Sequence, residues 1–160
     1  MVQFFATCPK GLEYLLRDEL VALGASEVHE ALSGVHFSGD LVDGYRACLW
    51  SRLASRVLMP LAEFAAADED ALYDGVQQID WSQHLAEEGT LAVDAISNAS
   101  QMRHTRYLAQ KVKDAVVDQF RDRSGNRPGV DLEHPSIRLN LLLRKDRALL
   151  SLDLSGTPLH

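Results

Sequence analysis

The sequence predicts a mixed α/β fold built as two consecutive modules, and three features of its 160 residues support this. Short apolar segments that alternate with polar residues, as strands do, are interleaved with longer segments of helical periodicity. Glycine and proline separate many of these segments, where turns are expected. An alanine run at 65–67, followed by three acidic residues at 68–70, interrupts both patterns. We therefore expect one domain over 1–66 and a second over 67–160.

The first module is predicted to follow the order strand, helix, strand, strand, helix, strand. Leucines recur at helical spacing between 12 and 23, and Gly24 follows them at the position of a C-cap glycine. Ser33 and Gly34 are typical of a turn between paired strands, and Asp40 can cap the second helix. The expected strands are 4–7, 27–31, 35–38 and 56–65, and the expected helices are 12–23 and 41–50. This order is that of the ferredoxin-like split βαβ arrangement.

The side chains of helix 41–50 indicate which of its faces is buried. We expect its inward face to contain Leu41, Tyr45, Cys48 and Leu49. Trp50 and Trp81 both lie in apolar helical contexts, so they are predicted to pack in the core or between the two modules rather than to serve as base-stacking platforms.

The second module is predicted to contain an α/β layer of its own. A helix over 71–79 follows the acidic residues, which suit the positive end of a helix dipole. The longest helix, 105–121, places Leu108, Val112, Ala115, Val116, Gln119 and Phe120 on one face. The other expected elements are a helical piece at 81–87, a strand at 91–96, a loop at 123–129 and a hairpin of strands 137–143 and 148–154.

Charge is distributed unevenly along the chain. The net charge of −7, taken alone, argues against a nucleic-acid partner, because phosphate contacts require local positive charge. Residues 1–100, however, contain 5 basic and 16 acidic side chains, whereas residues 101–147 contain 11 basic and 6 acidic ones. A basic segment on an acidic body indicates one surface for an anionic partner. Chance segregation of charge is the alternative.

The basic side chains gather on the longest predicted helix and on the loop after it. At 100° per residue, Arg103, Arg106 and Lys113 project away from the apolar face, and so does Arg121. The candidate contacts with an anionic partner are Arg103, Arg106, Tyr107, Lys111, Lys113, Arg121, Arg123 and Arg127. Asp114 and Asp118 border this set, so a solvated face of mutually paired charges is the alternative.

No catalytic or cofactor motif is visible. The ten glycines never fall as Gly-x-Gly-x-x-Gly or as a P-loop, and the Asp/Asn-Pro-Pro-aromatic loop of amino-methylating enzymes is missing. The six histidines lack metal-ligand spacing, and Cys8 and Cys48 are expected to be reduced, buried thiols. The carboxylates at 68–70 and 87–88 suit helix starts better than acid–base chemistry. We therefore expect no catalytic residue, no metal and no cofactor in these 160 residues.

The chain has neither an apolar run of roughly 20 residues nor the basic, apolar start of a signal peptide. A cytoplasmic protein without a membrane contact is therefore expected.

Six segments, in order along the chain, resemble the start of THUMP-domain RNA methyltransferases. The strongest likeness is to the bacterial bifunctional family that methylates guanines of 23S ribosomal RNA at N2 and N7. The segments are residues 5–13, 23–25, 34–39, 50–58, 111–118 and 152–156, followed by Leu159 and His160.

This resemblance implies a ferredoxin-like domain followed by a THUMP domain, which together bind structured RNA. It also implies that the parent protein is an S-adenosylmethionine-dependent rRNA (guanine-N2) methyltransferase, whose cofactor and catalytic residues belong to a C-terminal domain. The chain would then be a fragment that docks 23S rRNA through its basic surface, with Lys113 and its basic neighbours as contacts. A protein-interaction or small-ligand regulatory module with a ferredoxin-like fold is the alternative.

Overall fold

The computed structural model describes residues 1–86, 89–98, 100, 102, 104–125, 128–130 and 135–155. It confirms the mixed α/β class and forms two compact units: Met1–Pro60 with the segment from Asp153 onward, and Leu61–Leu152. The boundary expected between residues 66 and 67 follows the end of strand β4 (Arg56–Ala65), whereas the division by contacts falls inside that strand.

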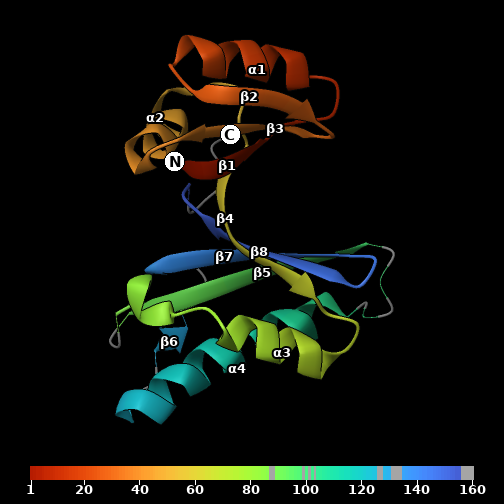
Figure 1. The fold of residues 1–160 in the computed structure, drawn as a ribbon, viewed down its shortest axis with the longest axis vertical. Helices are drawn as coiled ribbons and strands as arrows, with labels where there is room; N and C mark the ends of the chain where they lie inside the picture. Colours follow the sequence, from red (N-terminus) through yellow and green to blue (C-terminus); the bar gives the residue numbers. More distant parts are fainter. Residues whose placement is uncertain are drawn as a thin grey trace. The chain divides into compact units, whose positions relative to one another are not determined.

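The first unit has the predicted element order and an antiparallel sheet (Figure 1). Its strands are ordered β2-β3-β1-β4, and β1 pairs antiparallel with both β3 and β4. The elements preceding β4 are β1 (Val2–Thr7), α1 (Glu13–Ala22), β2 (Ser26–Ala31), β3 (Gly34–Gly39) and α2 (Leu41–Trp50). Helix α1 packs on β2 and β3. This is the topology of the split βαβ arrangement.

Two local signals for helix ends are confirmed. Gly24 has a φ of +91°, and the N–H groups of Gly24 and Ala25 donate to the carbonyls of Val21 and Leu20 at 3.0 Å. Asp40 caps α2, because its carboxylate accepts from the Asp43 N–H at 3.0 Å and the Asp43 carboxylate accepts from the Asp40 N–H at 2.9 Å. Such reciprocal bonds satisfy backbone groups that a helix end leaves free.

The predicted inward face of α2 is wrong. Its buried residues are Gly44 and Ala47, whereas Leu49, which was assigned to that face, is 78% exposed. Trp50, for which packing was predicted, is 68% exposed. Two further residues assigned to that face, Leu41 and Tyr45, are also exposed, and only Cys48 is half-buried. Small residues face the core because the helix lies close to the sheet, where an added Cβ at Gly44 would meet the ring of Phe4 at 2.5 Å.

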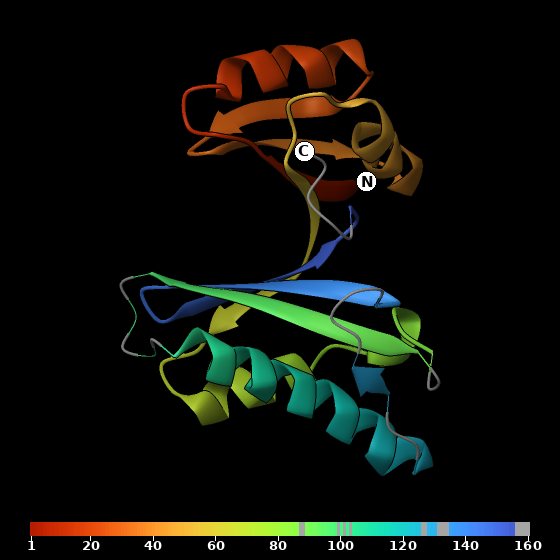
Figure 2. The ribbon, with the colours of Figure 1, turned by 180° about the vertical axis from the view of Figure 1, so that it is seen from behind.

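The second unit contains a mixed sheet in the order β4-β8-β7-β5-β6, to which β4 contributes its C-terminal half (Figure 2). Strand β5 runs parallel to β7 and β6, whereas β7 and β8 form an antiparallel hairpin. The elements are α3 (Glu69–Gln77), η1 (Trp81–Gln83), β5 (Thr90–Asn98), α4 (Thr105–Ser124), β6 (Gly129–Val130), β7 (Ile137–Arg144) and β8 (Arg147–Asp153).

Two elements of the second unit depart from the prediction. The helical piece expected over 81–87 is a short 3-10 turn, η1, and its residues 87 and 88 lie outside the described residues. The loop expected over 123–129 ends in β6, where Gly129 and Val130 pair with Thr90 and Leu91. A two-residue strand is too short to show the alternation on which strand prediction depends.

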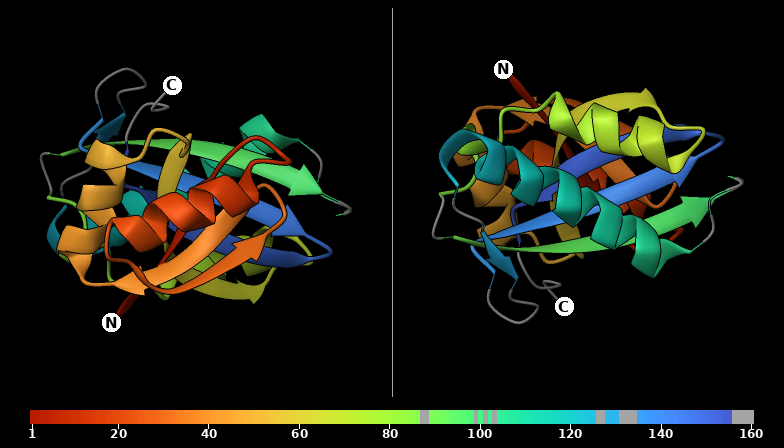
Figure 3. Two further views of the ribbon diagram at one scale, coloured as in Figure 1. Left: turned by 90° about the horizontal axis from the view of Figure 1, so that it is seen from above. Right: turned by 90° about the horizontal axis from the view of Figure 1, so that it is seen from below.

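Helices α3 and α4 cover one face of the second unit's sheet (Figure 3). Every residue predicted for the inward face of α4 is buried: Leu108, Val112, Ala115, Val116, Gln119 and Phe120. Trp81 is fully buried, as predicted, and its indole N–H donates to the Val76 carbonyl at 3.0 Å. With this face fixed against the sheet, the basic residues of α4 are left on its outer flanks.

Candidate nucleic-acid interface

Helix α4 carries six of the eight candidate contacts. Arg103 and Arg127 lie outside the described residues. Arg106, Tyr107, Arg121 and Arg123 are exposed, whereas Lys111 and Lys113 are half-buried. The six side chains do not share one environment, because α3 lies along one flank of α4 and the edge of the sheet lies along the other.

Two of the six candidates contact α3. The Tyr107 hydroxyl donates to Glu69 at 3.1 Å, and the Lys111 ammonium lies 5.5 Å from the centre of the Tyr73 ring. A cation at this distance is attracted to the electron-rich face of the ring. Both side chains therefore link the two helices, and neither is free of protein contacts.

Asp118 binds a third candidate, Arg121. One oxygen of the Asp118 carboxylate lies 2.9 Å from the Arg121 guanidinium, and the other accepts the Tyr73 hydroxyl hydrogen at 2.6 Å. The hydrogen bond to Asp118 is the largest of the effects that raise the pKa of Tyr73 to about 12. The Arg121 side chain remains 50% exposed, so its charge is shared between Asp118 and solvent.

Arg123 also has an acidic partner. Its guanidinium lies 2.8 Å from Asp80, which caps η1 by accepting from the Ser82 hydroxyl at 2.6 Å and the Ser82 N–H at 3.2 Å. The Ser82 hydroxyl, followed by Arg123, lowers the pKa of the Asp80 carboxyl. Asp80 thus stays ionised and partly neutralises Arg123.

Arg106 and Lys113 lie on the opposite flank, beside the sheet. They line a hollow of about 350 Å³ whose other walls are Leu91, Ala92, Val93, Ala109, Gln110 and Val130. Neither cation forms an ion pair within the part of the chain that the structure describes. These two side chains combine positive charge with an aliphatic surface, and no carboxylate of the described residues pairs with them.

The strand edge beside this hollow is largely open. Strand β6 pairs with β5 only at Thr90 and Leu91. From Ala92 to Asn98 the same edge of β5 has no strand partner among the described residues. This edge of β5 lies next to Arg106 and Lys113, and no described strand pairs with its backbone donors and acceptors there.

The residues present do not suit a nucleotide-type cofactor. In parallel α/β units such a group binds where a strand ends and the following helix begins. Here that place is the connection from β5 to α4, residues 99–104, which contains no glycine. The α4 N-cap, His104, makes no capping hydrogen bond with its side chain.

Other reactive chemistry is equally limited within the described ranges. The described residues contain no group of three or more His, Cys, Asp or Glu that could hold a metal ion. Burial, and secondarily Asp153, raises the pKa of the Cys48 thiol to about 11, which keeps it protonated at neutral pH. No described helix is long and apolar enough to cross a membrane.

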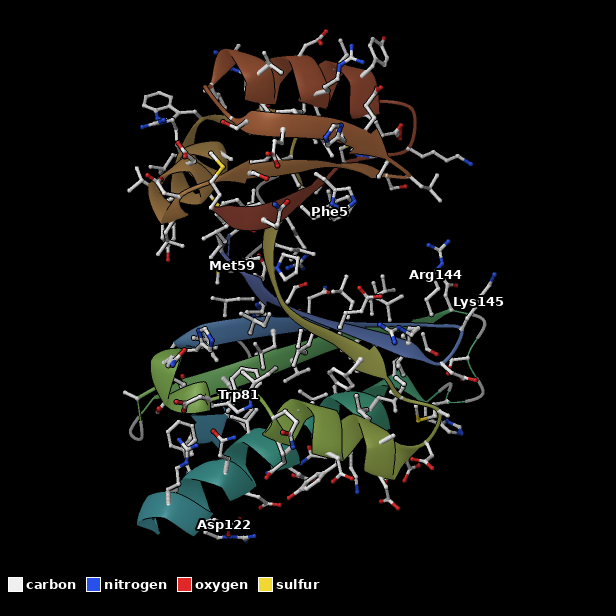
Figure 4. The ribbon with its side chains drawn as sticks, in the orientation of Figure 1. Phe5, Met59, Trp81, Asp122, Arg144 and Lys145 are labelled. Carbon is white, nitrogen blue, oxygen red and sulfur yellow. The ribbon has the colours of Figure 1, made fainter. Side chains whose placement is uncertain are left out.

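A further basic cluster is absent from the contacts predicted from sequence. Arg144, Lys145 and Arg147 lie at the turn between β7 and β8, and all three are exposed (Figure 4 labels Arg144 and Lys145). Three cations within four residues of a hairpin connection are a sufficient signal for such a cluster. The strand pattern on either side predicts only a turn there.

Two family models match consecutive parts of the chain. The first, described as the RlmL ferredoxin-like domain, matches residues 3–58. The second, the THUMP domain, matches residues 66–153, which is more than half of the chain.

Two curated relatives extend this similarity over nearly the whole chain. The chain is 58% identical over 159 residues to the ribosomal RNA large subunit methyltransferase K/L of Syntrophotalea carbinolica, and the matched region covers 99% of this chain and 22% of the relative. It is 56% identical to the enzyme of the same name from Methylococcus capsulatus, over 98% of this chain and 21% of the relative. The chain thus spans about a fifth of the length of these relatives.

A solved structure shows the same fold. A predicted N6-adenine-specific DNA methylase from Listeria monocytogenes superimposes with a TM-score of 0.85 at 28% identity, over 98% of this chain and 41% of that protein. The two units are therefore found together within a longer polypeptide in that protein.

Proposed function

The chain belongs to the THUMP-domain family, and from this membership we propose that it docks structured 23S ribosomal RNA through the basic surface of α4. The docked RNA presents a guanine to a methyltransferase domain elsewhere in the same polypeptide. That domain binds S-adenosylmethionine and performs the transfer. The relatives' names support the RNA and the reaction, and the chain's small share of their length supports a separate catalytic domain.

The observation that carries this proposal is that Arg106 and Lys113 form no ion pair with any residue that the structure describes. A cation that is already neutralised by a carboxylate gains little from a phosphate, because one ion pair replaces another. Arg106 and Lys113 have no such partner among the described side chains. They can therefore bind phosphates and release the counterions that accompany RNA, which is the main source of affinity in such complexes.

The proposed RNA-binding surface also includes the other candidate contacts. Arg121 and Arg123 are half-exposed, so they can contribute to the local field while they stay bound to Asp118 and Asp80. Tyr107 and Lys111 extend the surface toward α3. Arg103 and Arg127 remain proposed contacts on sequence grounds alone.

The test is the salt dependence of binding to a structured 23S rRNA fragment. The double variant Arg106→Gln, Lys113→Gln is compared with the wild type and with the matched control Lys10→Gln, an exposed cation of the first unit. We expect the slope of log affinity against log salt to fall by about two in the double variant, about one for each phosphate that is no longer neutralised. The control should keep the wild-type slope, and an unchanged slope in the double variant would contradict the proposal.

A further inference from the structure

We propose that the tip of the β7–β8 hairpin is a second RNA-binding site, which holds phosphates through Arg144, Lys145 and Arg147 and an unstacked base on the aliphatic surface beside them. This inference rests on the proposed function and names a contact region that lies outside α4.

The first observation is an arrangement of like charges. Arg144 and Arg147 are direct partners in the register of β7 and β8. Two cations in directly opposed positions destabilise a pair of strands. Among the described residues the counterion of this pair is Glu63, which lies 3.5 Å from Arg147, and both of these side chains are more than half exposed. Stability alone disfavours this pairing, whereas an anion bound between the two cations would relieve their repulsion.

The second observation is the backbone of the turn. Lys145 and Asp146 both have positive φ, +48° and +62°, in a two-residue connection that usually contains Asn-Gly. Side chains other than glycine are strained in this region, and surrounding contacts must hold them there. The Lys145 N–H donates to the Asn98 carbonyl at 3.2 Å, and the Asp146 carbonyl accepts from the Ala66 N–H at 2.8 Å. The backbone of the tip is therefore anchored to the ends of β5 and β4, so the positions from which its cations extend are fixed before RNA binds.

The third observation is the position of the one acidic residue in the turn. The Ser100 hydroxyl lies 3.4 Å from the Asp146 carboxylate, and Ser100 is buried. Asp146 itself is half-buried, whereas Arg144, Lys145 and Arg147 are exposed. The carboxylate is thus directed toward the protein, and the exposed charge at the tip is positive.

The fourth observation is a hollow that these cations border. It has a volume of about 490 Å³ and is lined by Leu142, Ala148 and Leu149 together with Glu63 and the three cations. Leu142 and Leu149 are direct partners in the register of β7 and β8. Leu142 precedes Arg144 by two positions and Leu149 follows Arg147 by two, so both leucines share a sheet face with the arginines. An aliphatic floor with a cationic rim suits a nucleotide, because the faces of a base are apolar and its phosphates are anionic. Unpaired bases are the usual targets of sequence-specific RNA recognition and can stack on guanidinium planes, which Arg144 and Arg147 supply at this rim.

The test compares variants of the whole chain in binding to a structured 23S rRNA fragment. We expect Arg144→Gln, Arg147→Gln to flatten the slope of log affinity against log salt by about one to two, the upper value applying if a phosphate replaces Glu63 as the partner of Arg147. Its thermal stability should equal or exceed that of the wild type, since a repulsive pair has been removed. Leu142→Asn should weaken binding several-fold at every salt concentration and leave the slope unchanged, because binding of a base releases no counterions. Arg46→Gln, which removes an exposed cation of the first unit, is the matched control.

Failure of this inference can be distinguished from failure of the proposed function. If the hairpin variant keeps the wild-type slope while the slope of the α4 variant falls by about two, the hairpin site is excluded and the proposed function stands. If the wild type binds the fragment without any salt dependence, both proposals fail.

Discussion

Tyr73 shows how single residues divide the basic surface of α4. Its hydroxyl donates to Asp118, and its ring lies beneath Lys111, so one side chain on α3 engages two charged groups of the longer helix. Periodicity correctly placed the basic residues outside the core. It could not indicate which of them are neutralised, because Asp80, Glu69 and Tyr73 reach α4 only through the tertiary fold.

The Tyr73 hydroxyl predicts a stability change at high pH. The pKa of Tyr73 is raised to about 12 in the folded state, whereas an unfolded tyrosine has a pKa of roughly 10. The hydrogen bond of the neutral hydroxyl therefore stabilises the fold fully below pH 10, and this contribution is lost as the pH rises through 12. Tyr73→Phe should cost about 1 kcal/mol at pH 8. The difference between variant and wild type should shrink above pH 10 in denaturant titrations. A difference that stays constant to pH 12 would show that the Asp118 hydrogen bond contributes nothing.

At the scale of elements, the sequence predicted the order of helices and strands better than it predicted which face of a helix is buried. The long helix and the strands other than β6 were located correctly because their apolar residues follow one period. Helix α2 was located correctly but its inward face was wrong, because apolar side chains surround it. Which face is buried depends on how closely the helix approaches the sheet, and Gly44 and Ala47 set that distance.

Gly44→Ala tests this account of α2. Helix propensity alone predicts that alanine stabilises a helix by up to about 1 kcal/mol over glycine. We expect a loss of about 1–3 kcal/mol instead, because the new methyl group would overlap the Phe4 ring. The free energy of unfolding from urea titrations is the measurement. Val42→Ala, on an exposed position of the same helix, should change it by less than about 0.5 kcal/mol, and a stabilising Gly44→Ala would refute the packing argument.

At the scale of the whole molecule, the chain returns to its first unit after completing the second. The Asp153 carboxylate is fully buried and binds Arg56, the Ser155 N–H at 3.0 Å and the Ser155 hydroxyl at 2.6 Å. The Leu154 N–H donates to the Val57 carbonyl at 2.9 Å. Composition could mark a change near residue 66, but it carried no signal for this return, because the contacts join residues almost one hundred positions apart.

Asp153→Ala should therefore destabilise the first unit selectively. Removing one partner leaves Arg56 without its counterion, which costs about 3–5 kcal/mol for a buried pair. Hydrogen exchange should show reduced protection in β1 and β3, with the amides of β7 unaffected. Asp18→Ala breaks an exposed pair with Arg17 and should cost less than about 1 kcal/mol. Equal reduction of protection in both units would contradict the assignment of Asp153 to the first.

The most direct test of RNA docking is ultraviolet crosslinking of the chain to a structured 23S rRNA fragment, followed by mass spectrometry of the crosslinked peptides. We predict crosslinks in peptides from α4, around Arg106 and Lys113, and from the β7–β8 turn. Crosslinks confined to the acidic first unit would contradict the account.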